Sequence, residues 1–271
     1  MSEAQRHDSW QAGESYEAYM GRWSRKVAPR FLSWIGADND LDWLDLGSGT
    51  GALTGAILAT QSPSSVVGVE PSPGFVAHAS ETQPDHRASF IVGTAEELPL
   101  ADATRDVAVS GLVLNFVPDR ARALREMIRV VRPGGTVAFY VWDYPGGGVE
   151  FMRMFWRSAI ELDPAAADLA EDKRFPFCTP EQLIAMADDA GLASVECAPI
   201  EVPTIFQSFE DYWHPFTLGA GPAPGYCSAL PADAREKLRA RLEASLPRGD
   251  GGTIPLNARA WTLRGTAPQA G

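Results

Sequence analysis

Cysteine is scarce in this chain. Its three cysteines, Cys178, Cys197 and Cys227, lie far apart and form no CxxC pair. This spacing argues against a disulfide framework and against a zinc site. Long apolar runs are also missing, since no stretch approaches the ~20 residues that span a bilayer. The polar start, 1–10, does not resemble a secretory signal. These absences predict a cytoplasmic protein with no metal site and no membrane segment.

Positive charge is in short supply as well. The chain has 23 Lys and Arg residues against 35 Asp and Glu residues, a net charge of −12. A polyanionic partner is repelled unless the cations form a local basic face. The densest basic stretch, 120–132, also contains Glu126 and is typical of a solvated helix face. The charge balance therefore predicts that the protein binds no nucleic acid.

A composition of 45% hydrophobic residues over 271 positions is sufficient for one large α/β domain, alone or with a small cap. Strand and helix patterns alternate along residues 41–141. The expected strands are 41–46, 66–70, 88–93, 106–114 and 136–141, and the expected helices are 52–59, 75–82 and one from Asp119 to the break at Pro133-Gly134-Gly135. In that last helix we expect an inward stripe of Ala121, Leu124, Ile128 and Val131. Near-continuous apolar strands alternating with helices imply a parallel sheet covered on both faces.

The flanking regions are less regular. Residues 1–15 are a polar lead, and 16–35 are expected to be helical, with a stripe of Tyr16, Met20, Trp23 and Val27. Thr179-Pro180 predicts a helix start. We further expect strands at 194–202 and 258–263, a loop-rich aromatic segment at 204–226, a charged helix at 232–246 and a turn at 249–252.

The most informative motif is the glycine turn Gly47-Ser48-Gly49-Thr50-Gly51, between the first strand and the first helix. Glycine lets the backbone turn sharply and approach a ligand closely. Ligands of open parallel sheets bind at the carboxyl ends of the strands. Glu70 ends the second strand there, and a carboxylate can accept both hydroxyls of a ribose. The motif and the acid together predict a nucleoside site.

These features resemble the class I S-adenosylmethionine (AdoMet)-dependent methyltransferases, in particular the type 11 or ubiquinone-biosynthesis-like group. The segments that carry the resemblance are 44–51, 67–70, 93–100, 106–119 and 131–135, within about residues 41–143. The resemblance implies a Rossmann-like α/β fold with a mostly parallel seven-stranded sheet, helices on both faces and a small lid. It implies AdoMet as methyl donor. The expected parts are an N-terminal helical segment, 1–40, a donor-binding core, 41–143, and a remainder, 144–271, with the lid and the end of the sheet.

The resemblance also implies which residues bind the donor. Asp45 and the glycines would hold its methionine part, Glu70 its ribose and the 94–96 turn its adenine. The full set expected at the donor is Arg22, Trp23, Asp45, Gly47, Ser48, Gly49, Gly51, Glu70, Pro71, Thr94, Ala95, Glu96, Ser110, Gly111 and Leu112. Thr94 departs from the family, which often has Asp there, and an uncharged partner of the adenine amino group binds more weakly.

Methyl transfer from a sulfonium depends mainly on orientation and exclusion of water, which together supply ~7–11 kcal/mol of a barrier. No dedicated base is therefore required. Where the acceptor must lose a proton, the candidates are His214, Asp143 and Tyr19. The aromatic segments 151–156 and 206–226 are expected to form an apolar lid over a small-molecule acceptor.

Two alternatives remain open. A nicotinamide-dependent oxidoreductase shares the turn and the strand-end acid, but the chain lacks the GxGxxG spacing and a Tyr-x-x-x-Lys pair. A non-catalytic AdoMet-binding sensor or partner subunit has the same binding residues and differs only in transferring no methyl group.

Overall fold

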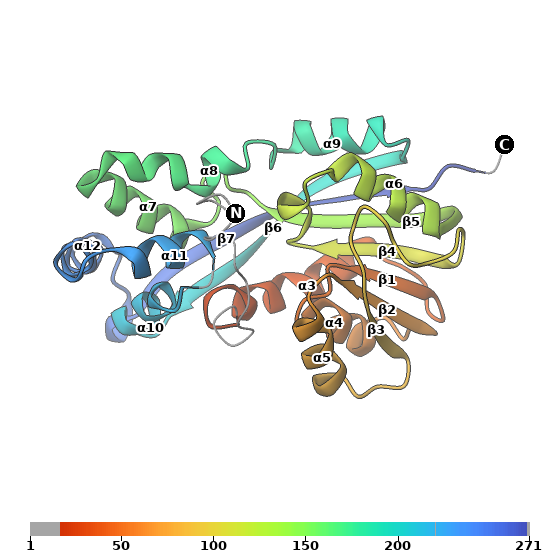
Figure 1. Cartoon of the computed structure of the whole chain (residues 1–271), viewed down its shortest axis with the longest axis horizontal. Coiled ribbons are helices and arrows are strands. Elements are labelled where there is room, and N and C mark those ends of the chain that lie inside the picture. Colours follow the sequence, from red (N-terminus) through yellow and green to blue (C-terminus); the bar gives the residue numbers. More distant parts are fainter. Residues whose placement is uncertain (1–16, 220, 270–271) are drawn as a thin grey trace. The chain divides into compact units, whose positions relative to one another are not determined.

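The computed structural model describes residues 17–219 and 221–269 (Figure 1). Seven strands form one sheet in the order β3-β2-β1-β4-β5-β7-β6. The first five strands pair in parallel, as in the register Leu44–Val67 between β1 and β2. The strands are β1 (Asp42–Leu46), β2 (Ser65–Glu70), β3 (Ala88–Val92), β4 (Arg105–Gly111), β5 (Val131–Trp142), β6 (Ala193–Phe206) and β7 (Ile254–Thr266). The predicted seven-stranded α/β fold is confirmed.

Helices connect these strands. The α-helices are α3 (Arg22–Ile35), α4 (Ala52–Thr60), α5 (Pro73–Thr82), α6 (Arg120–Val130), α7 (Glu150–Leu162), α8 (Glu171–Arg174), α9 (Pro180–Asp189), α10 (Phe209–Trp213), α11 (Pro222–Ala229) and α12 (Ala232–Ser245). A π-helical turn, η1 (Glu17–Gly21), precedes α3, and the 3-10 turns are η2 (Leu114–Phe116), η3 (Pro164–Leu169), η4 (His214–Thr217) and η5 (Asp250–Gly252). The predicted polar lead at 1–15, and Tyr16, lie outside the described residues.

The chain divides into two compact units. The described part of the sheet unit comprises 24–141, 177–200 and 260–269, and it includes β1 to β4. Within it, α3, α4 and α5 lie on one face of the strands and α6 and α9 on the other (Figure 1). The described part of the helical unit comprises 17–23, 142–176, 201–219 and 221–259, and it includes α7, α8 and α10 to α12.

Local sequence signals explain where several helices begin. The Thr179 hydroxyl accepts a hydrogen bond from the Gln182 N–H at the start of α9, with Pro180 at the first helical position. Asp119 caps α6 in the same way through the Arg122 N–H. The predicted helix start at Thr179 is confirmed, because side-chain caps are local and do not depend on the tertiary fold.

The predicted inward stripe of α6 is right at Leu124 and wrong at Ala121. The helix buries Ala123, Leu124, Met127 and Val130, while Ala121 is exposed. The error followed from extending the helix to the Pro-Gly-Gly break. Val131 instead has extended backbone angles and pairs with Arg105 of β4. β5 therefore begins before Pro133, and a register shift between Arg105 and Val107 accommodates the break within the sheet.

Two further expectations are corrected. The strand predicted over 106–114 ends at Gly111, since Leu112 has a positive φ of 63° that no strand allows. The segment predicted as loop-rich, 204–226, consists mostly of regular secondary structure: β6 runs to Phe206, and α10, η4 and α11 follow. Helices this short contain fewer than three turns, so they show little periodicity in a sequence.

Candidate functional site

The glycine turn has the backbone that its sequence predicts. Gly47, Gly49 and Gly51 have φ values of 71°, 52° and 84°, in the left-handed region that favours glycine. The Gly47 N–H donates to the Val69 carbonyl at 2.7 Å and fixes the turn to β2. A Cβ on Gly47 would lie 2.5 Å from the Val113 side chain, whereas one on Gly49 would meet nothing within 4 Å. The turn therefore presents bare backbone to open space at Gly49.

Glu70 is tied to this turn. One carboxylate oxygen accepts the Gly49 N–H at 3.1 Å, and the other accepts the Ser72 N–H at 3.0 Å. The side chain is only 7% exposed. Burial raises the pKa of its carboxyl, and the two backbone N–H donors oppose that rise. Each oxygen keeps a further lone pair, so the carboxylate can accept two hydroxyls in addition. This geometry fits a ribose.

Asp45 lies on β1 and is 1% exposed. Its carboxylate accepts a hydrogen bond from the Thr54 hydroxyl at 2.7 Å. Burial raises the pKa of the Asp45 carboxyl to about 6, and the charge of Glu70 adds to the rise. A buried carboxylate is stabilised by a positive partner, so Asp45 fits an ammonium group such as that of a methionine.

The raised pKa of Asp45 makes stability depend on pH. The folded-state pKa lies near 6, above the ordinary value of 3.8, so the folded protein holds its proton more tightly than the unfolded chain. Stability from this group is full below pH 4 and is lost as the pH rises through 6. We expect Asp45→Asn to gain about 3 kcal/mol relative to the parent between pH 4 and pH 7. Urea unfolding of both proteins at the two pH values measures this change, and parallel pH profiles would contradict it.

The remaining expected donor residues follow three neighbouring strand ends. Pro71 is exposed directly after β2. After β3, Thr94 bridges to Glu97, so that Ala95 and Glu96 form the corner of a tight turn. Because β1, β2, β3 and β4 are parallel neighbours, these carboxyl ends share one edge of the sheet.

At the end of β4, the three expected residues differ in their surroundings. The Ser110 hydroxyl donates to the Leu46 carbonyl at 3.0 Å, so it ties β4 to β1. A Cβ on Gly111 would lie 2.6 Å from the Tyr140 hydroxyl, and only glycine fits there. Leu112 holds a φ of 63°, a strained state for a bulky residue that proteins keep mostly at functional positions.

Sequence reasoning missed Asn115, which lies in η2 just beyond β4. Its side chain is buried, and its Nδ2 has no hydrogen-bond partner among residues 17–219 and 221–269. The hydroxyl of Ser48, in the glycine turn, is likewise buried without a partner there. Unsatisfied buried donors are costly, so both groups have hydrogen-bonding capacity that a ligand at this edge of the sheet can use. The signal available in the sequence was that Asn115 directly follows the predicted strand 106–114.

Arg22 and Trp23 belong to the helical unit. The Arg22 guanidinium donates to Asp211 at 2.7 Å and lies 4.3 Å from the centroid of the Trp23 ring and 4.8 Å from that of Phe206. It is thus held by a carboxylate and two aromatic faces. A role of Arg22 and Trp23 at the donor stays a prediction.

Replacing Arg22 tests that role. We expect Arg22→Ala to lower the free energy of unfolding by about 1–3 kcal/mol, because it leaves the half-buried Asp211 without its cation. Binding of AdoMet by calorimetry is the second readout. An unchanged dissociation constant would remove Arg22 from the donor site.

The three candidate bases, all in the helical unit, have different environments. His214 is exposed at the start of η4. Asp143 is buried and accepts the Gly146 N–H at 2.9 Å and the Arg259 guanidinium at 2.6 Å. Tyr19 is 2% exposed, and its hydroxyl has no partner in the part of the chain that the structure describes. A catalytic role of any of them stays a prediction. Asp143 would first have to leave its ion pair.

The described residues contain no group of His, Cys, Asp and Glu that could hold a metal ion. Within the same ranges, none of the helices combines the length and apolarity that crossing a bilayer requires.

Comparisons with known proteins agree with this geometry. A family model described as a methyltransferase domain matches residues 44–139. Demethylmenaquinone methyltransferase of Roseiflexus sp. is 32% identical over 56% of this chain and 68% of its own length. Arsenite methyltransferase of Halobacterium salinarum is 32% identical over 61% of this chain, which spans only 40% of that relative.

A solved structure, Haemonchus contortus phosphoethanolamine N-methyltransferase 2 in complex with S-adenosyl-L-methionine, shares the fold. The alignment has a TM-score of 0.61 and 14% identity, and it covers 100% of this chain and 60% of the other chain. The matched domain contains the glycine turn, Glu70 and the β4 end, the positions where the geometry fits a nucleoside with an ammonium group. The chain belongs to the class I AdoMet-dependent methyltransferases, in the type 11 group.

Proposed function

We propose that this chain transfers the methyl group of AdoMet to a small-molecule acceptor. The observation that carries the proposal is the pairing of Glu70 with the glycine turn, where a buried carboxylate already orders the Gly49 N–H and retains lone pairs for two ribose hydroxyls. A ribose-binding carboxylate beside a glycine turn, at the carboxyl edge of a parallel sheet, is the arrangement that a nucleoside donor such as AdoMet needs.

The donor-side roles follow from the contacts. Glu70 would accept the ribose hydroxyls, and Asp45 would face the methionine ammonium, which stabilises the ionised carboxylate that burial disfavours. The turn Thr94–Glu97 would line the adenine, and the strained backbone of Leu112 would lie under it. When bound, the donor supplies a methyl group already activated by a sulfonium. The protein's part is to orient that carbon and exclude water.

A small-molecule acceptor is supported by two observations. The net charge of −12 opposes binding of a polyanion such as nucleic acid. The relatives named above are methyltransferases of arsenite and of demethylmenaquinone, both small molecules. Family membership also favours methyl transfer over the nicotinamide-dependent alternative, whose fingerprint the chain lacks.

The test separates binding from turnover. Calorimetric titration with AdoMet checks the donor site, and incubation with donor labelled in its methyl group checks transfer to a metabolite extract. We expect saturable binding and a labelled product of low mass. Tight binding with no labelled product would favour the non-catalytic sensor. Absence of binding would refute the donor site itself.

A further inference from the structure

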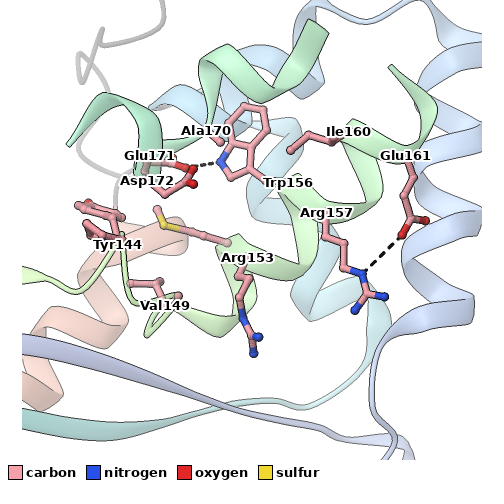
Figure 2. A pocket seen from close by; sticks show the side chains of 13 residues that line it. Tyr144, Val149, Arg153, Trp156, Arg157, Ile160, Glu161, Ala170, Glu171 and Asp172 are labelled. Atoms are coloured by element: carbon pink, nitrogen blue, oxygen red, sulfur yellow. Dashed lines mark hydrogen bonds and ion pairs between the residues drawn. The ribbon is translucent and has the colours of Figure 1, made fainter. Parts of the chain in front are cut away.

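The helical unit encloses a cavity of about 450 Å³. Its walls come from the loop after β5, from α7 and from the start of α8 (Figure 2). Tyr144, Met152, Trp156 and Ile160 supply apolar surface. This volume lies within the range of small-molecule sites, which combine apolar walls with a few placed polar groups.

One polar group inside this wall is incomplete. Glu171 is 3% exposed, and one of its carboxylate oxygens accepts a hydrogen bond from the Trp156 indole N–H. The other oxygen, Oε1, is buried with no partner among the described residues. A buried carboxylate oxygen without a hydrogen-bond partner is costly, so Glu171 at this position does not by itself stabilise the fold. A ligand that donates an O–H or N–H to Oε1 removes that cost.

A second orphaned group belongs to the same neighbourhood. Burial raises the pKa of the Tyr19 phenol well above its ordinary value, and the charge of Glu171 is the next cause. The Tyr19 hydroxyl has no partner within the described ranges. Tyr212, equally buried, shows the usual arrangement, since its hydroxyl donates to the Phe151 carbonyl at 2.8 Å. In contrast to Tyr212, Tyr19 and Glu171 each keep a buried oxygen that a ligand can hydrogen-bond.

The two arginines that line the cavity are largely exposed. Arg153 pairs with Glu150 and Arg157 with Glu161, all on α7. In Figure 2 the Arg153 side chain extends away from Glu171. Among the described residues that line it, the cavity therefore offers a ligand apolar surface and one buried hydrogen-bond acceptor.

We propose that this cavity binds an apolar small molecule that donates a hydroxyl or N–H hydrogen to Oε1 of Glu171. The inference goes beyond the proposed function, because it concerns a ligand of the helical unit alone and does not depend on that ligand's being the methyl acceptor. Burial raises the pKa of the Glu171 carboxyl to about 7, so above that pH the carboxylate repels anionic small molecules and accepts a hydrogen bond. Ligands without a donor group leave its oxygen unsatisfied.

A matched pair of probes tests the site. 2-Naphthol carries a hydroxyl on an apolar bicyclic frame, and 2-methoxynaphthalene has the same frame without the donor. Calorimetry on the full chain at about pH 8.5, above the raised pKa of Glu171, should show that 2-naphthol binds about tenfold more tightly or better, as expected for one hydrogen bond to a charged group. Equal affinities, or no binding of either probe, would overturn the proposal.

Three variants locate the effect. Glu171→Gln keeps an oxygen for the Trp156 N–H but presents a donor in place of Oε1, so the preference for 2-naphthol should vanish. Ile160→Trp fills the cavity and should weaken both probes more than tenfold. Asp168→Asn removes an exposed carboxylate of η3 that does not line the cavity, and it should alter neither affinity. A retained preference in Glu171→Gln would overturn the assignment of Oε1.

Two results separate this inference from the proposed function. If AdoMet fails to bind while the 2-naphthol preference persists, the methyltransferase proposal fails and the cavity stands as a ligand site. If methyl transfer occurs and the two naphthalenes bind equally, the cavity inference alone fails. Thermal melting of each variant, with the parent as reference, confirms that it is folded.

Discussion

Glu70→Ala should weaken AdoMet binding by about a hundredfold. The carboxylate is expected to accept both ribose hydroxyls, and hydrogen bonds to a charged group contribute roughly 1.5–3 kcal/mol each. The substitution also frees the Gly49 N–H, which Glu70 now accepts at 3.1 Å, so the turn loses part of its order before the donor arrives. Calorimetric titration of the parent and the variant measures the ratio of dissociation constants.

The matched control is Glu81→Ala, which removes an exposed carboxylate from α5, outside the expected donor residues. It changes the net charge equally and should leave the affinity within about twofold, since single surface charges have small effects. Glu70→Gln should fall between the parent and Glu70→Ala, because it keeps one acceptor oxygen. Full affinity in Glu70→Ala would place the ribose elsewhere and remove the observation that carries the proposed function.

Phe216→Ala should cost about 3–5 kcal/mol of the free energy of unfolding. Phe216 is almost fully buried, and its ring stacks on that of Phe155 with 4.4 Å between the centroids and 8° between the planes. Tyr19 and Tyr212 meet it at centroid distances of 5.4 and 5.2 Å. Removing a ring from such a packed cluster loses its transfer free energy and leaves a cavity. Urea unfolding measures the loss.

Phe209→Ala provides the comparison for that prediction. Phe209 lies in the same segment, but it is half-exposed and stacks on Trp213 at 6.4 Å between centroids. We expect it to cost about 1 kcal/mol. Similar losses in the two variants would contradict a packed core around Phe216. AdoMet binding should survive both changes, because all of its expected ligands except Arg22 and Trp23 belong to the sheet unit.

Local signals made the sheet predictable. Alternating strands and helices, side-chain caps such as Thr179 and the glycine turn each depend on a few adjacent residues. The errors arose where tertiary pairing decides. Val131 joins a strand because Arg105 of β4 pairs with it, and the helical face of α6 shifts accordingly. The short helices of 206–229 form where aromatic side chains pack against one another, and this packing leaves no periodic pattern in the sequence.

The candidate site divides in the same way. Gly47, Gly49 and Glu70 could be proposed from sequence, since their backbone demands and strand-end position are visible in it. The cavity residues Trp156 and Glu171 could not, because their meaning comes from burial and from one unsatisfied oxygen. Glu171 looks like an ordinary first-turn acid of a short, charged helix until its surroundings are known.

The path of the chain constrains how this protein can diversify. It passes from one compact unit to the other at 23/24, 141/142, 176/177, 200/201 and 259/260, and β5, β6 and β7 each supply residues to both. Exchanging the helical unit between relatives by recombination would therefore need five simultaneous junctions, three of them inside strands. Selection for new ligands of the cavity should act instead through single substitutions on α7 and α8, so paralogues are expected to differ at individual side chains there while their donor-binding strand ends stay alike.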